Sequence, residues 1–189
     1  MARIFIIGPG GVGKTMAGAE LAGLLECPFV DLDQAFMARV GHVDAVIQGQ
    51  GYARYVEMNS ALFAALVPEL PPACVVALSS GFLARETPAP LLTANRNAVR
   101  AAGTSIRLLP SADLAEASRI VVARQMGRGF NLDEARETAK FARRFADYMD
   151  QGDIRIFSAA APAQIAAEVV AALTSDCAQG CLARHDCRT

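Results

Sequence analysis

The sequence predicts an α/β fold in which a five-stranded parallel sheet is flanked by helices. Three observations indicate this fold. Short, almost continuously apolar runs alternate with longer segments rich in helix-forming residues, and a glycine-rich stretch directly follows the first run. Continuously apolar strands suit a sheet that is covered on both faces, and strands separated by helices imply parallel pairing. The sequence contains no internal repeat and no linker that would divide the chain.

The strands are predicted from five apolar runs. Each is short, rich in β-branched or other apolar residues, and bounded by glycine, proline or polar residues. The run at 73–80 is fully apolar until it ends in two serines. In chain order the predicted strands span 2–7, 28–33, 73–80, 104–110 and 153–158.

The helices are predicted between these strands. Ala, Leu, Met and Glu dominate the first of them, Pro68 stops the third, Ser111 or Asp113 is a suitable N-cap, and Pro162 fits a first turn. In chain order the predictions are a helix at 14–26, an irregular helical region up to Gly49, helices at 52–66, 95–102, 111–125, 133–150 and 162–173, and a loop at 82–93.

Composition sets the class of protein. The chain has 189 residues, of which 53% are hydrophobic, and its mean hydropathy is +0.28. Its net charge of −1 gives no reason to expect a nucleic-acid or membrane-surface partner. No apolar run reaches the length of a membrane span, and the N-terminal residues do not resemble a signal peptide. We therefore expect a monomeric cytoplasmic protein with one domain at 1–174 and a weakly ordered tail at 175–189.

The five cysteines do not indicate a disulfide scaffold, because their number is odd and no secretion signal is recognised. Cys27 and Cys74 border apolar runs and are predicted to be buried hydrophobic residues. The three tail cysteines lie near His185, but their spacing differs from that of paired zinc ligands, so we expect no metal there.

The stretch GPGGVGKT at 8–15 predicts a phosphate-binding loop. It fits G-x-x-x-x-G-K-[ST] and lies between a predicted strand and a predicted helix, which is the context that this motif requires. Its backbone N–H groups and the helix N-terminus would bind phosphate oxygens, the lysine would reach the β- and γ-phosphates, and the threonine would bind Mg²⁺. The predicted nucleotide-binding residues are Gly8, Gly10, Gly11, Val12, Gly13, Lys14 and Thr15, and the predicted cofactors are ATP and Mg²⁺.

The second predicted strand ends in the acidic pair Asp31 and Asp33. Two residues apart on a strand, both side chains would face the same way, at the strand end where ligands gather. One carboxylate could hold magnesium through water, and the other could accept a proton from a substrate hydroxyl. The alternative is a strand-end turn in which an aspartate caps a helix.

With its phosphate loop at residue 8, its D-x-D near residue 31 and an arginine-bearing stretch late in the chain, the sequence resembles the shikimate kinase family. The resemblance covers roughly residues 3–173. It implies a P-loop kinase of the nucleoside-monophosphate-kinase type with a short lid, which transfers the γ-phosphoryl group of ATP to the 3-hydroxyl of shikimate. It also implies that Asp31 helps to hold magnesium and that Asp33 contacts the substrate hydroxyl.

The resemblance implies two arginines for the substrate carboxylate. GQGYARYVE places Arg54 in the family's arginine position, and RRFADY places Arg144 at the family's spacing before Tyr148. If they converge, they form a clamp suited to a planar carboxylate. Another alignment of the first stretch would lose the arginine, and Arg54 would then be an exposed helical residue.

Two further motifs depart from the family. Its strand-end glycine run is LSSGFL here, so that Ser80 and Gly81 are predicted to line the substrate pocket after Ser79. The lid motif is RQMGRGF, in which Arg128 is the candidate contact for the transferring phosphate and Arg124 lies near the adenine or the phosphates. An arginine there could offset the charge that develops on the phosphoryl group.

These departures leave alternatives to a shikimate kinase. One is a P-loop kinase of another small hydroxylated metabolite, such as a sugar acid. The other is a non-catalytic nucleotide-binding regulator of the same fold. The complete phosphate loop and Asp33 favour an enzyme, because nucleotide binding alone does not require a second carboxylate.

Overall fold

The computed structural model describes residues 2–127 and 133–185. Its centre is a five-stranded, all-parallel sheet in the order β2-β3-β1-β4-β5, which confirms the predicted fold class. The strands are β1 (Ile4–Ile7), β2 (Phe29–Asp31), β3 (Val75–Ala77), β4 (Thr104–Leu109) and β5 (Ile154–Phe157). Their carboxyl ends therefore lie at one edge of the sheet, where the candidate site is found.

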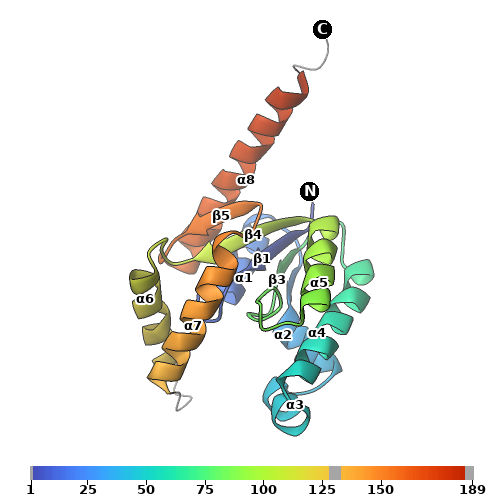
Figure 1. Ribbon diagram of the computed structural model, residues 1–189. Helices are drawn as coiled ribbons and strands as arrows, with labels where there is room; N and C mark the ends of the chain where they lie inside the picture. The colour runs from blue at the N-terminus through green and yellow to red at the C-terminus, as the bar shows by residue number, and fades with distance from the viewer. Residues whose placement is uncertain (1, 128–132, 186–189) are drawn as a thin grey trace.

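Helices cover both faces of the sheet (Figure 1). They are α1 (Lys14–Leu24), α2 (Leu32–Arg39), α3 (Val43–Gln50), α4 (Tyr52–Leu66), α5 (Ala89–Ala102), α6 (Leu114–Met126), α7 (Glu134–Met149) and α8 (Pro162–His185), with a 3₁₀ turn η1 at Val67–Glu69. Figure 1 also shows the second half of α8 projecting away from the rest of the molecule.

The alternation of strand side chains produces two hydrophobic cores. On β1, Phe5 and Ile7 point into a core that includes α2, α4 and α5, whereas Ile4 and Ile6 point into a core that includes α1, α6 and α8. All four are essentially inaccessible to solvent. The sheet is thus buried on both faces, as the continuously apolar strands predict.

Several element boundaries differ from the sequence predictions. α5 begins at Ala89, within the predicted loop, because Pro90 falls in the first turn where a missing N–H costs nothing. β2 ends at Asp31, so that Asp33 lies in α2 and not on the strand. α8 continues to His185, past the predicted end at Leu173, and no proline interrupts that stretch.

The sequence also predicts that Cys27 and Cys74 are buried hydrophobic residues and that no segment spans a membrane. Cys74 is buried and Cys27 half-buried, and neither forms a disulfide. Cys187 lies outside the described residues. Within residues 2–127 and 133–185, no helix has both the length and the apolar character needed to cross a membrane.

Candidate active site

The predicted phosphate loop joins β1 to α1. Gly11 and Gly13 adopt φ angles of 81° and 100°, which glycine reaches without steric cost, and a Cβ at Gly11 would lie 2.8 Å from Val121. The turn directs the chain into the N-terminus of α1, where the N–H groups of the first helical turn favour an anion. Val12 is completely buried in the core of the protein.

Lys14 begins α1 and folds back over the phosphate loop. Its side-chain nitrogen Nζ donates to the carbonyl oxygens of Gly8 and Pro9 at 2.8 and 2.9 Å. Only 9% of the residue is exposed. The ammonium group is therefore held beside the loop that would receive the phosphates, where a positive charge is needed.

Asp31 connects the loop to the second strand. Its Oδ1 accepts from the backbone N–H groups of Asp33 and Gln34 at 2.9 and 3.1 Å, which makes it the N-cap of α2. Its Oδ2 accepts from the hydroxyl of Thr15 at 2.7 Å. The capping alternative is therefore present, and the two residues that were each predicted to hold Mg²⁺ lie side by side. A hydroxyl and a carboxylate so close together form an oxygen donor set of the kind that Mg²⁺ prefers.

Asp33 lies in the first turn of α2, with two hydroxyl groups against it. Ser79, just after β3, donates to its Oδ1 at 2.6 Å, and Tyr55 of α4 donates to the same oxygen at 3.4 Å. Burial of Tyr55, together with the neighbouring charge of Asp33, raises the pKa of the tyrosine. The tyrosine thus stays a hydrogen-bond donor and helps to fix the orientation of the carboxylate.

A single cavity joins these groups. Its volume is about 230 Å³. Residues of the phosphate loop, the acidic pair and the end of β3 line it together with Gln125 of α6: Gly10, Gly11, Gly13, Lys14, Thr15, Asp31, Asp33 and Ser80. The structure therefore brings five of the predicted nucleotide-binding residues and the predicted proton acceptor Asp33 to one space, whereas Gly8, Val12 and Arg124 do not line it.

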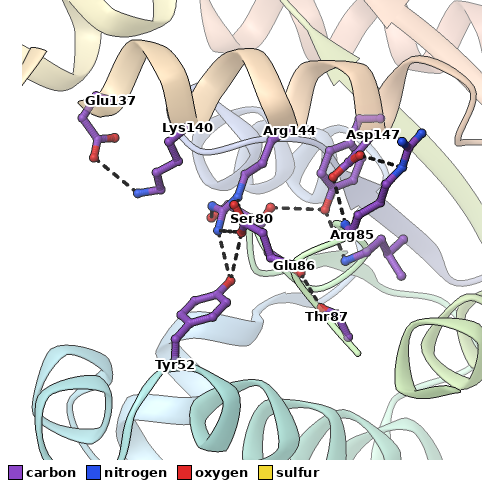
Figure 2. Close-up of polar contacts among 12 residues, drawn as sticks. Tyr52, Ser80, Arg85, Glu86, Thr87, Glu137, Lys140, Arg144 and Asp147 are labelled. Carbon is purple, nitrogen blue, oxygen red and sulfur yellow. Dashed lines mark hydrogen bonds and ion pairs between the residues drawn. The ribbon is translucent and has the colours of Figure 1, made fainter. Parts of the chain in front are cut away.

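Arg144 of α7 lies at the centre of a second polar cluster (Figure 2). Its guanidinium group donates to Glu86, to the Ser80 hydroxyl at 2.9 Å and to the Tyr52 hydroxyl at 3.0 Å. Burial disfavours the charged form, but Tyr52 and Glu86 more than offset this, so that the pKa of Arg144 is raised. A Cβ at Gly81 would lie 2.3 Å from the Tyr52 hydroxyl, so glycine is needed there for this contact.

The predicted pairing of Arg54 with Arg144 is contradicted. Arg54 forms an ion pair with Glu57 on the same helix at 3.0 Å, and both side chains are 55% exposed. Tyr52 and Tyr55 turn inward from α4, and at about 100° per residue Arg54 is carried to a different face. Among the described residues, only Arg144 of this pair contacts Ser80 and Tyr52.

Of the two arginines predicted near the lid, Arg124 and Arg128, the structure describes only Arg124. Arg124, in the last turn of α6, donates to the carbonyl oxygen of Ala159 after β5 at 2.9 Å. It therefore links α6 to the loop that follows the last strand, and its role toward a nucleotide stays a prediction. Arg128 lies outside the described residues.

Sequence reasoning missed four residues of the site: Tyr52, Tyr55, Glu86 and Gln125. The two tyrosines are three residues apart on one helix, a spacing that indicates a shared face and was available from the sequence. Glu86 and Gln125 carry no local signal, because their positions depend on how a loop and α6 pack against the phosphate loop.

The fold and the site together are those of a P-loop kinase. The sheet is parallel, and the phosphate loop and a carboxylate line one cavity. The family model described as shikimate kinase matches residues 10–174. The chain belongs to the shikimate kinase family, and it is an ATP-dependent kinase.

Individual relatives agree with this assignment. The chain is 31% identical to shikimate kinase 2 of Escherichia fergusonii, over 90% of this chain and 91% of that protein. It is 28% identical to shikimate kinase 2 of an Enterobacter species, over 93% and 97% of the two chains. In fold it is similar to the structure of a shikimate kinase from Acinetobacter baumannii in complex with shikimate, with a TM-score of 0.73 at 20% identity over 93% and 94% of the chains. A gluconokinase from Sinorhizobium meliloti shares the fold, with a TM-score of 0.63 at 18% identity over 92% of each chain.

Proposed function

We propose that this protein transfers the γ-phosphoryl group of ATP to the 3-hydroxyl group of shikimate. The observation that carries the proposal is the cavity of about 230 Å³, because the phosphate loop and Asp33 line the same space. The acceptor is taken from the family: the relatives are shikimate kinases, and the A. baumannii enzyme was solved in complex with shikimate.

In this proposal, two residues of the cavity act directly on the reacting groups. Lys14 binds the β- and γ-phosphates and offsets the charge that spreads over them. Asp33 orients the acceptor hydroxyl and receives its proton. Ser79 and Tyr55 both donate to Oδ1 of Asp33, which fixes the carboxylate before the substrate arrives. Catalysis then consists mainly of holding the hydroxyl and the γ-phosphate in line.

Thr15 and Asp31 would hold Mg²⁺. Their side-chain oxygens are 2.7 Å apart, and magnesium sites of kinases combine one or two carboxylates with substrate phosphates. When bound, the ion would help to neutralise the charge that develops on the phosphates. Asp31 is already held by two backbone N–H groups, so its second oxygen is oriented toward Thr15 without the ion.

A coupled ADP-release assay tests this function. Purified protein, ATP and Mg²⁺ are incubated with shikimate, quinate, gluconate or an uncharged polyol, and the phosphate ester is identified by ³¹P and ¹H NMR. We expect ADP release that requires shikimate and gives shikimate 3-phosphate. Turnover of gluconate or of a polyol without turnover of shikimate would contradict the proposed substrate.

A second candidate is a kinase of another small hydroxylated metabolite, such as a sugar acid. The observation that favours it is the position of Arg54, because without that residue the two-arginine carboxylate clamp is lost. The same panel separates the two candidates. If the protein binds ATP but phosphorylates none of the compounds, a non-catalytic nucleotide-binding regulator would replace both.

We also propose that residues 1–174 form the kinase domain, with 175–189 as an appended tail, and that the protein acts as a monomer in the cytoplasm. The family match ends at residue 174, which supports the boundary. The net charge of −1 supports the absence of a nucleic-acid partner. Size-exclusion chromatography with light scattering tests the oligomeric state.

A further inference from the structure

The strongest unexplained feature of the site is a carboxylate on the guanidinium group of Arg144. Oε2 of Glu86 accepts from Nε of Arg144 at 3.0 Å and from Nη2 at 2.5 Å. The arginine side chain is 6% exposed and the glutamate side chain 28% exposed. Figure 2 shows Glu86 reaching this arginine from the loop that follows β3.

The hydrogen-bond count of Arg144 leaves little room for a substrate carboxylate. The guanidinium group has five N–H donors. Nε donates to Glu86, and Nη2 donates to Glu86 and to Tyr52. Nη1 donates to Ser80 with one of its two hydrogens. Arginine binds a carboxylate best through two parallel N–H groups, and no such pair remains. A second carboxylate can take that fork only if Glu86 leaves it.

Glu86 is better placed to move than Arg144. The residues on either side of it are anchored: the backbone amide of Arg85 donates to Asp147 at 2.9 Å, and the backbone amide of Thr87 donates to the carbonyl of Ala84 at 3.0 Å. Glu86 itself makes its contacts through Oε2 alone. Its side chain can therefore rotate toward solvent while the loop stays in place.

Arg144, in contrast, is held from several sides. It lies on the inner face of α7 with Phe141, Phe145 and Tyr148, all of them buried. Ser80 and Tyr52 would keep the guanidinium group in position after Glu86 has left. If Glu86 moved away, the guanidinium group of Arg144 would be left oriented, desolvated and without its carboxylate, next to Ser80.

We infer that Glu86 is a displaceable internal counter-ion of Arg144 and a determinant of acceptor specificity. In the empty enzyme it neutralises the arginine, and a substrate carboxylate takes its place on binding. The inference rests on the proposed function, because it assumes that a small carboxylate is the acceptor. Each carboxylate substrate must then break an existing ion pair before it can form its own, whereas an uncharged polyol gains nothing from the exchange.

The test is Glu86→Gln, which keeps the size and polarity of the side chain but removes its charge. Because a neutral amide holds the guanidinium group less strongly than a carboxylate, we expect the KM for shikimate to fall by about three- to tenfold. The KM for ATP should stay unchanged. An analogue of shikimate with its carboxylate reduced to a hydroxymethyl group should show no gain.

The matched control is Glu69→Gln. Glu69 also pairs with an arginine, Arg39 at 2.7 Å, but both side chains are exposed and neither lines a cavity of the site. This substitution removes the same charge from the protein but leaves the contacts of Arg144 unchanged. We expect its KM for shikimate and its melting temperature to match those of the wild type.

Two results would overturn the inference. A higher KM for shikimate in Glu86→Gln would mean that Glu86 holds Arg144 in its working position, and an unchanged KM would mean that the pair is not broken on binding. If the wild type does not phosphorylate shikimate, the proposed function fails. The inference about Glu86 can still be tested by measuring shikimate binding to the wild type and to Glu86→Gln by calorimetric titration. Tighter binding to Glu86→Gln supports it, whereas equal or undetectable binding to both proteins refutes it.

Discussion

The candidate site has two parts that are built in different ways: a nucleotide side around the cavity, and an acceptor side formed by the Arg144 cluster, which reaches the cavity through Ser80. The nucleotide side comes from one continuous stretch, 8–15, whose geometry depends on backbone turns at glycines and on the start of α1. The acceptor side is assembled from α4, the loop after β3 and α7, and it depends on hydrogen bonds between side chains such as Tyr52, Glu86 and Arg144. One side is specified locally, and the other only by the complete fold.

This difference has a consequence for specificity. Backbone N–H groups at a helix N-terminus recognise any phosphate, so the nucleotide side can be shared by many kinases. In the proposed function, side-chain hydroxyls and one arginine would recognise the acceptor, and each is a side-chain group that can be changed without disturbing the backbone. The acceptor side is therefore where substitutions can change specificity while the nucleotide side is kept.

The largest effect is expected at the junction of the two sides, from Asp33→Asn. The amide keeps the shape of the side chain but cannot accept the proton of the substrate hydroxyl. We expect kcat to fall by about 10²- to 10⁴-fold, as for loss of a general base, with ATP affinity nearly unchanged. Rapid-quench measurement of phosphoryl transfer and a separate nucleotide titration check the two parts.

Asp31→Asn is the matched comparison for Asp33→Asn, because it removes the same charge two residues away. It should act through the metal: the Mg²⁺ concentration for half-maximal rate should rise, since the amide is a weaker ligand beside Thr15. If both variants gave the same phenotype, the assignment of separate roles to the two aspartates would be wrong.

The nucleotide side is tested by Lys14→Ala. Loss of this ammonium group removes a charge that would stabilise the transferring phosphate. We expect kcat to fall by about 10²- to 10³-fold and ATP to bind about tenfold or more weakly. Titration with a fluorescent ATP analogue measures the affinity, and unchanged affinity would rule out the phosphate-loop assignment.

The same contrast explains how much of the molecule could be predicted from its sequence. The sheet, the phosphate loop and the location of Asp31 at a strand end follow from patterns within a few residues and from the parallel topology. Asp33 lines the cavity with Asp31, but strand alternation does not place it there. It lies in the first turn of α2, which Asp31 caps. Glu86 was not predictable, since a contact between residues 58 apart in sequence requires the packed helices.

On the acceptor side, Arg144→Ala is expected to have a smaller effect than the variants of the catalytic groups. A charge-assisted hydrogen bond to a carboxylate contributes roughly 1.5–3 kcal/mol, which corresponds to about ten- to a hundredfold in affinity. We expect the KM for shikimate to rise by that factor and the KM for ATP to change little. Steady-state kinetics at saturating levels of the other substrate measures both values. A rise in the KM for ATP of similar size would place Arg144 on the nucleotide side.

Arg54→Ala should have the smallest effect, and it tests the division between the two sides most directly. The arginine pairs with Glu57 three residues along α4, and exposed pairs of this kind contribute little to stability. Because Arg54 is not on the inward face that carries Tyr52 and Tyr55, we expect the KM for shikimate to change by less than about twofold. Steady-state kinetics beside Arg144→Ala, with circular dichroism to confirm folding, makes the comparison. A KM raised tenfold or more would mean that α4 turns or shifts when the substrate binds. The acceptor side would then be completed by the substrate itself, with Arg54 and Arg144 converging only in the closed complex.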